Sequence, residues 1–259
     1  MPMKIGFTER GDAGLDLSWF DKIDNDQVNG AILITKNITP GFKERVLSLY
    51  QNKKKLIVHC TCTGWGGTKI EPNVPRYKNQ LDALKNLIDT GFPKAQCVLR
   101  IDPIFPIKEG FTAVENVLAY ADKINLLPMR IRASIFDEYP HTRQRFIDNG
   151  IAPLYEQHYA PLSMIKATAE FLTKMSEKFN LQFETCAETK LSAMLNDDIA
   201  ITRGCLSKTD LDIMGIQTDI NFGENIQNRY GCHCLTCKTE LLTRRHPCAN
   251  GCLYCYWKN

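Results

Sequence analysis

The chain has 259 residues, of which 44% are hydrophobic and 24% are charged, and its formal net charge is +3. These values describe an ordinary globular protein, long enough to bury a core as one large domain or one domain with an appendage. The small net charge does not by itself indicate a polyanionic partner.

The chain contains 11 cysteines, and eight of them follow residue 180. Residues 1–7 lack the layout of a signal peptide, and no run of 18 apolar residues occurs. A secreted disulfide scaffold would be shorter and would carry a signal. We therefore predict a cytoplasmic protein without a membrane span, in which several reduced thiols are metal ligands.

Short β-rich stretches alternate with amphipathic stretches over the first 190 residues. The alternation predicts a parallel sheet built from βα units. The predicted strands are Lys4–Thr8, Ala31–Thr35, Lys55–Cys62, Gln96–Ile101, Met129–Ile135 and Leu181–Cys186. The predicted helices, which have apolar residues at helical spacing, include Phe42–Leu49, Leu81–Ile88, Val114–Ile124 and Met164–Phe179.

Polar residues gather where these strands end. Lys36 and Asn37 follow the second strand, Arg100 and Asp102 share one face at the end of the fourth, and Ser134 ends the fifth. Ligands of parallel α/β proteins bind at the carboxyl ends of strands, so these positions indicate an active-site rim. A buried Arg100–Asp102 ion pair that holds two strands together is the structural alternative.

The pattern changes after Met194. Residues 196–259 show no clear strand–helix unit beyond a possible helix at Lys208–Met214, yet they hold seven cysteines. We expect two parts, residues 1–195 with the parallel sheet and residues 196–259 as a tail ordered by metal. Residues 226–259 are also locally basic, which leaves a nucleic-acid-binding tail as an alternative.

Three of the tail cysteines, Cys248, Cys252 and Cys255, have C-x3-C-x2-C spacing. Three thiolates on a short loop suggest an iron–sulfur cluster with one iron left open, or with a fourth ligand from elsewhere. A zinc ribbon made from Cys252 and Cys255 with the pair Cys234 and Cys237 is an alternative.

A second group joins the pair Cys232 and Cys234 to Cys205 and Cys186. Four thiolates suit either zinc or a fully ligated 4Fe–4S cluster, and spacing does not separate these. Cys237 lies close in the sequence without a place in this set of four. The early cysteines are most simply small core residues; they are Cys60, Cys62 and Cys97.

The run from Cys248 to Cys255, with Tyr254 before its last cysteine, resembles the signature of radical S-adenosylmethionine (SAM) enzymes. In that superfamily three cysteines hold a 4Fe–4S cluster whose fourth iron is chelated by SAM. The motif usually follows the first strand of a partial (β/α)6 barrel, whereas here it lies far downstream.

The whole chain resembles the family called domain of unknown function 1848, whose terminal cysteine cluster is similar to that of radical SAM enzymes. The resembling stretches are Thr8–Asp12, Ile34–Asn37, Ile70–Pro75, Leu99–Ile104, Cys186–Glu188, Gly204–Cys205, Cys232–Cys234 and Cys248–Tyr256. The resemblance implies a partial (β/α)6 parallel barrel whose mouth is closed by the tail. It also implies a second, auxiliary 4Fe–4S cluster on Cys186, Cys205, Cys232 and Cys234.

For such an enzyme we expect Lys36 or Arg100 to pair with the SAM carboxylate. Glu71 or Asp102 would accept from its ammonium group, and Tyr254 would lie beside its adenine. The complete set of expected cofactor-binding residues is Lys36, Asn37, Glu71, Arg100, Ser134 and Tyr254. The expected catalytic residues are Arg100, Asp102 and Glu188.

The leading hypothesis is a radical SAM enzyme that needs a reductant such as flavodoxin or ferredoxin. Its substrate is not readable from the sequence, and a small molecule, a peptide, a nucleotide or DNA are all allowed. Two other hypotheses are a zinc-stabilised nucleic-acid-binding module and an iron–sulfur electron carrier or redox sensor without SAM chemistry.

Overall fold

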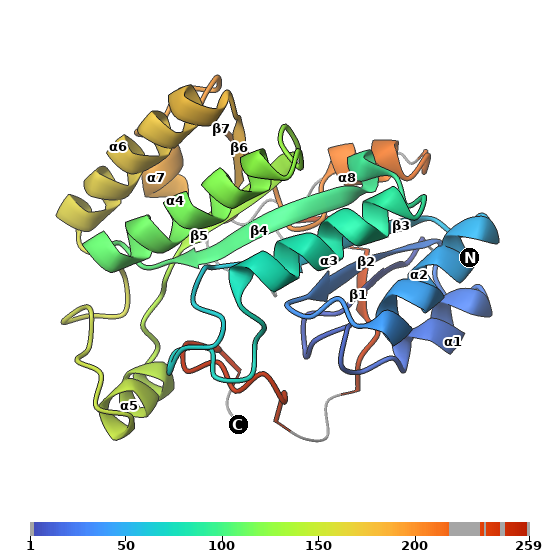
Figure 1. Cartoon of the computed structure of the whole chain (residues 1–259), viewed down its shortest axis with the longest axis horizontal. Coiled ribbons are helices and arrows are strands. Elements are labelled where there is room, and N and C mark those ends of the chain that lie inside the picture. The colour runs from blue at the N-terminus through green and yellow to red at the C-terminus, as the bar shows by residue number, and fades with distance from the viewer. Residues whose placement is uncertain (1–2, 218–233, 236, 244–246, 258–259) are drawn as a thin grey trace.

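One all-parallel sheet organises the computed structural model, which describes residues 3–217, 234–235, 237–243 and 247–257 (Figure 1). Within those residues the sheet has eight strands in the order β7-β6-β5-β4-β3-β2-β1-β8. The strands are β1 (Ile5–Phe7), β2 (Gly30–Thr35), β3 (Leu56–Thr61), β4 (Cys97–Ile104), β5 (Arg130–Ile135), β6 (Phe183–Thr185), β7 (Ala200–Thr202) and β8 (Lys238–Glu240).

Helices connect successive strands along most of the sheet, as parallel pairing requires. They are α1 (Trp19–Asp24), α2 (Pro40–Gln51), α3 (Tyr77–Asp89), the 3-10 helix η1 (Lys94–Gln96), α4 (Lys108–Lys123), α5 (Pro140–Asp148), α6 (Leu162–Phe179), α7 (Thr189–Ser192) and α8 (Lys208–Ile213). None of the helices in the described part of the chain is both long and apolar enough to cross a membrane.

The predicted parallel α/β sheet is confirmed, and each of the six predicted strands overlaps a strand of the structure. The sequence shows no clear strand–helix unit in residues 196–259, yet strands β7 and β8 lie there, and the possible helix at Lys208–Met214 corresponds to α8. Both strands have three residues, and β8 reads Lys-Thr-Glu, so no apolar alternation marks it. Pairing of β8 with β1 supplies the order that its sequence lacks.

The two faces of the sheet are covered by different parts of the chain. On β2, Leu33 belongs to the core formed with helices α2, α3, α4 and α6, of which α3 and α4 lie in front of the sheet in Figure 1. Its neighbour Ile32 points to the opposite face, where it packs with Leu211 of α8 and with Leu235. Residues from beyond position 196 therefore cover the face that the connecting helices leave open.

The part of the chain after residue 196 also occupies both edges of the sheet. Strand β7 pairs with β6, and β8 pairs with β1 in the register Ile5↔Lys238 and Phe7↔Glu240. The amide of Leu241 donates to the carbonyl of Phe7 at 2.7 Å. Whether residues 1–195 and 196–259 form separate domains stays a prediction, since they share this sheet.

Candidate functional site

A cavity of about 200 Å³ lies at the carboxyl edge of the sheet. Its lining combines strand ends, the segments that follow them and residues of the stretch 248–257. Five of the residues expected at a SAM site line it, namely Lys36, Arg100, Asp102, Ser134 and Tyr254. All three cysteines of the C-x3-C-x2-C motif line the same cavity.

The stretch 248–257 is fixed over this edge by buried hydrogen bonds. Asp12, only 4% exposed, accepts from the side chain of Asn250 at 2.6 Å and from the backbone amide of Lys36 at 2.7 Å. The amide of Leu253 donates to the carbonyl of Ile70 at 3.0 Å. These bonds tie the cysteine stretch to the segments that follow β1, β2 and β3.

Helix α5 provides a further anchor, and it lies near the red C-terminal segment in Figure 1. The guanidinium of Arg145 donates to the carbonyls of Leu253 at 3.2 Å, Cys255 at 2.8 Å and Trp257 at 2.7 Å. A planar guanidinium has five donors, so one side chain can satisfy three carbonyls of an irregular segment. The backbone around Cys255 is thereby fixed from the β5 side of the cavity.

Cys248, Cys252 and Cys255 line the same cavity, but their three sulfurs do not all lie within 4.8 Å of one another. Among the described residues, a different group of three cysteines meets that distance limit. Burial is the main cause that raises the pKa of Cys252 to about 12; Lys36 opposes it, and Glu71, Cys255 and Cys248 add to it. A bound metal would displace these thiol protons.

Lys36, Glu71 and Tyr254 form a buried network beside Cys252. The Lys36 ammonium lies 2.9 Å from Glu71 Oε1 and 5.3 Å from the centre of the Tyr254 ring. The Tyr254 hydroxyl donates to the same Glu71 oxygen. Burial lowers the pKa of Lys36, but Glu71 and then Cys252 raise it more, so Lys36 stays protonated.

Glu71 itself does not line the cavity. It is fully buried behind Lys36 and Tyr254, and its Oε2 atom has no hydrogen-bond partner among the described residues. An unpartnered carboxylate oxygen in this setting is costly unless a donor reaches it. The network therefore positions Lys36 and leaves one acceptor unused.

Arg100 and Asp102 form an ion pair along β4 at the cavity wall. The ion pair of the structural alternative is present, and both of its residues belong to β4. Ser134 of β5 donates to the other oxygen of Asp102. Burial lowers the pKa of Arg100, but Asp102 raises it more, and the Nε atom of Arg100 has no partner in the described part of the chain.

Two of the expected site residues have other surroundings. Asn37 is outside the cavity lining, and its backbone amide donates to the Thr35 hydroxyl at 2.8 Å. Glu188 is also outside the lining, and it accepts from the amide of Ile135 at 2.7 Å. Both residues support the ends of lining strands, and their expected direct roles stay predictions.

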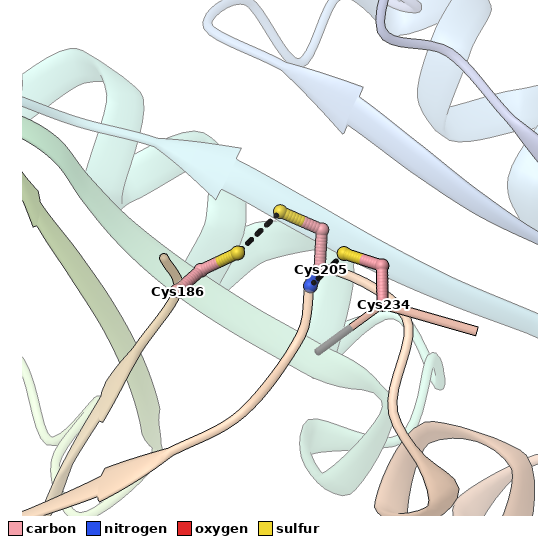
Figure 2. Close-up of side chains that lie close together, drawn as sticks. All are labelled: Cys186, Cys205 and Cys234. Carbon is pink, nitrogen blue, oxygen red and sulfur yellow. Dashed lines mark hydrogen bonds between the residues drawn. The ribbon is translucent and has the colours of Figure 1, made fainter. Parts of the chain in front are cut away.

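A second cysteine group lies beside the sheet face that α8 covers. The sulfurs of Cys186, Cys205 and Cys234 all lie within 4.8 Å of one another, and Figure 2 shows the three side chains converging. These three cysteines could hold a metal ion. Cys232, the expected fourth member, lies outside the described residues, and Cys237 is not part of the converging group.

A buried charge cluster holds this group in place. Arg132, 1% exposed, donates to Glu184 at 2.6 Å and to the carbonyl of Cys205 at 3.0 Å. Arg130 bonds to Glu184 at 2.8 Å and to Asp210 of α8 at 2.8 Å. Alternating charges at Arg130, Arg132 and Glu184 were a possible signal, since charge on central parallel strands is rare without a partner.

Positive charge also faces the converging sulfurs from β8. Burial lowers the pKa of Lys238, but Glu9 raises it more, and Cys205 and Cys234 raise it further. The Lys238 ammonium lies 2.9 Å from Glu9. Lys238 is thus ion-paired within the sheet, and the remaining basic residues of the 226–259 stretch lie outside the described part of the chain.

Three further cysteines are core residues, as the sequence predicts: Cys60, Cys62 and Cys97 are at most 1% exposed. The glycine-rich segment after β3 forms a tight loop, in which Gly66 bridges to Glu71. Cβ atoms on Gly66 would meet the Pro75 carbonyl oxygen at 2.0 Å, so this close approach requires glycine.

The fold and its cysteines define a parallel α/β protein with a candidate metal centre. The chain belongs to the family described as Domain of unknown function (DUF1848), whose profile matches residues 20–257. That match confirms the family resemblance of the sequence. A comparison with curated proteins finds no match.

Proposed function

We propose that the protein is a radical SAM enzyme whose cluster is held by Cys248, Cys252 and Cys255. The observation that supports this proposal most is that these cysteines line one cavity with Lys36 and Arg100 at the carboxyl edge of a parallel sheet. A partial (β/α)6 barrel with its mouth closed by the tail is part of the proposal. The sheet order and the anchoring of residues 248–257 are consistent with it.

The donors and acceptors beside the cavity fit a zwitterionic ligand such as the methionine end of SAM. Arg100 Nε, at the cavity wall, offers an unused donor for a carboxylate, whereas the unpartnered Glu71 Oε2 lies behind the cavity lining. The side-chain oxygen of Asn250 is a further buried acceptor without a partner among the described residues. Unpartnered buried polar atoms of both kinds are expected where a ligand with both charges binds.

When bound and reduced, the cluster would cleave SAM to methionine and a 5′-deoxyadenosyl radical, which abstracts hydrogen from the substrate. The chain's own residues supply position and shielding. Glu71 orients Lys36, and Asp102 orients Arg100, so both cations face the cavity with little freedom. Tyr254 covers the cavity wall beside Cys252 and excludes water from it.

Two roles remain for groups outside the cavity. A one-electron donor such as flavodoxin or ferredoxin would reduce the cluster. Glu188 would keep the end of β5 in register through its bond to Ile135, which places Ser134 and its partner Asp102 at the wall.

The test is SAM cleavage after anaerobic reconstitution with iron and sulfide. We expect dithionite and SAM to yield 5′-deoxyadenosine with the parent chain and none with Cys252→Ser. Cys237→Ser is the matched control, because Cys237 does not line the cavity. If iron loads without SAM cleavage, or if Cys252→Ser cleaves SAM as well as the parent chain, the proposal fails.

A further inference from the structure

The distances between the sulfurs of the second cysteine group distinguish a zinc ion from an iron–sulfur cluster, the two occupants that these residues allow. In a tetrahedral zinc site the Zn–S bonds are about 2.3 Å long, which sets the sulfurs about 3.8 Å apart. In a cubane cluster each thiolate binds its own iron, which sets the sulfurs roughly 6 Å apart. The distances between the sulfurs therefore indicate whether one ion or several irons lie between them.

The sulfurs of Cys186, Cys205 and Cys234 have the closer spacing. All three pairs lie within 4.8 Å, and Cys186 Sγ is 3.3 Å from Cys205 Sγ. A four-iron cluster would have to push all three apart by an ångström or more. The thiols of the cavity motif do not share this close packing, so the two groups of the same chain differ in this respect.

The surroundings of the three sulfurs resist such an expansion. The amide of Cys205 donates to Cys234 Sγ at 3.0 Å, which ties two of the ligand segments together. The carbonyl of Cys205 accepts from Arg132, whose guanidinium is fully buried and bound to Glu184. Backbone N–H donors and nearby cations stabilise thiolates, whichever metal they bind.

A disulfide is a weaker explanation for the close approach. It would use two of the three thiols and leave the third beside it without a role. Three converging thiols instead supply three of the four ligands of a tetrahedral zinc ion, and no other His, Cys, Asp or Glu of the described residues joins them.

We infer that Cys186, Cys205 and Cys234 form a single-ion zinc site, and that the auxiliary 4Fe–4S cluster expected at these residues does not fit there. Binding of Zn²⁺ displaces the three thiol protons to solvent, and no electron is transferred. This inference is independent of the radical SAM proposal, because the cysteines of the cavity take no part in it.

Metal analysis of the whole chain, purified without oxygen and reconstituted with iron and sulfide, tests the inference. The inference itself expects about one zinc per chain, and the proposed radical SAM cluster would add about four irons. Zinc X-ray absorption should show sulfur neighbours at about 2.3 Å and no second metal nearby. About eight irons and no zinc, or a site that holds no metal, would overturn the inference.

Variants assign the metals to their residues. Cys205→Ser should lose the zinc and keep the four irons, whereas joint replacement of Cys248, Cys252 and Cys255 by serine should lose the iron and keep the zinc. Cys237→Ser should keep both metals, because Cys237 is outside the converging group. If Cys205→Ser fails to fold, the triple serine variant still tests the inference. Absorption of an iron–sulfur cluster in that variant would contradict a zinc site at Cys186, Cys205 and Cys234.

A zinc result leaves the proposed function open to its own test. SAM cleavage by a chain that holds eight irons would refute this inference and support the radical SAM proposal. A chain that holds one zinc and does not cleave SAM would support the zinc site and refute the radical SAM proposal.

Discussion

Replacing Arg145 by alanine should release the cysteine stretch from the cavity without unfolding the sheet. The side chain donates to the carbonyls of Leu253, Cys255 and Trp257. At about 1 kcal/mol for each hydrogen bond, the loss is about 3 kcal/mol. That free energy corresponds to an increase of roughly 100-fold in the local opening equilibrium of residues 248–257.

Amide hydrogen exchange measures this opening residue by residue. In Arg145→Ala the amide of Leu253, which donates to Ile70, should lose roughly 100-fold of its protection, while amides of β2 and β3 keep theirs. Gln144→Ala is the matched control, because Gln144 is exposed on the same helix and its side chain bonds, among the described residues, only to Asp148. Unchanged protection of Leu253, or an equal loss throughout the sheet, would refute the reasoning.

Two further predictions concern buried charge. Lys36→Met leaves the buried Glu71 without its ion pair and should lower the free energy of unfolding at pH 7 by about 3–5 kcal/mol. The double variant Lys36→Met/Glu71→Gln should recover part of that loss. Urea unfolding measures both variants, and no recovery in the double variant would contradict the pairing. Burial raises the pKa of Glu184, but Arg132 and Arg130 lower it more, to a value below 4.5. The stability that this carboxylate adds is therefore present above pH 4.5 and is lost as the pH falls through the folded-state pKa. The urea midpoints of Glu184→Gln and the parent chain should therefore differ at pH 7 and become equal in acid. A difference in midpoint that does not change with pH would contradict this prediction.

The alternation of strands and helices could be predicted from sequence because apolar and β-branched residues recur in each of the six predicted strands, in continuous runs in some and between polar residues in others. Strands β7 and β8 could not, since three residues such as Lys-Thr-Glu have no pattern of their own. They become strands only when β6 and β1 offer free backbone groups. Local composition does not predict a strand whose structure depends on pairing with a segment far away in the chain.

The cavity shows the same division. Lys36, Arg100 and Ser134 stand at strand ends, so their meeting at one edge follows from parallel topology. Arg145 could not be found in this way, because it binds backbone carbonyls, which no side-chain pattern records. The distances between Cys186, Cys205 and Cys234 also require coordinates, since spacing along the chain allows zinc and iron–sulfur clusters equally.

The order of the segments around the cavity has a consequence for biosynthesis. Tyr254 bonds to a residue 183 positions earlier in the chain, and Trp257 bonds to one 248 positions earlier. The cysteine loop can therefore reach its cavity only after nearly all of the described chain has left the ribosome. The thiols of Cys248, Cys252 and Cys255 therefore leave the ribosome after the residues of all eight described strands.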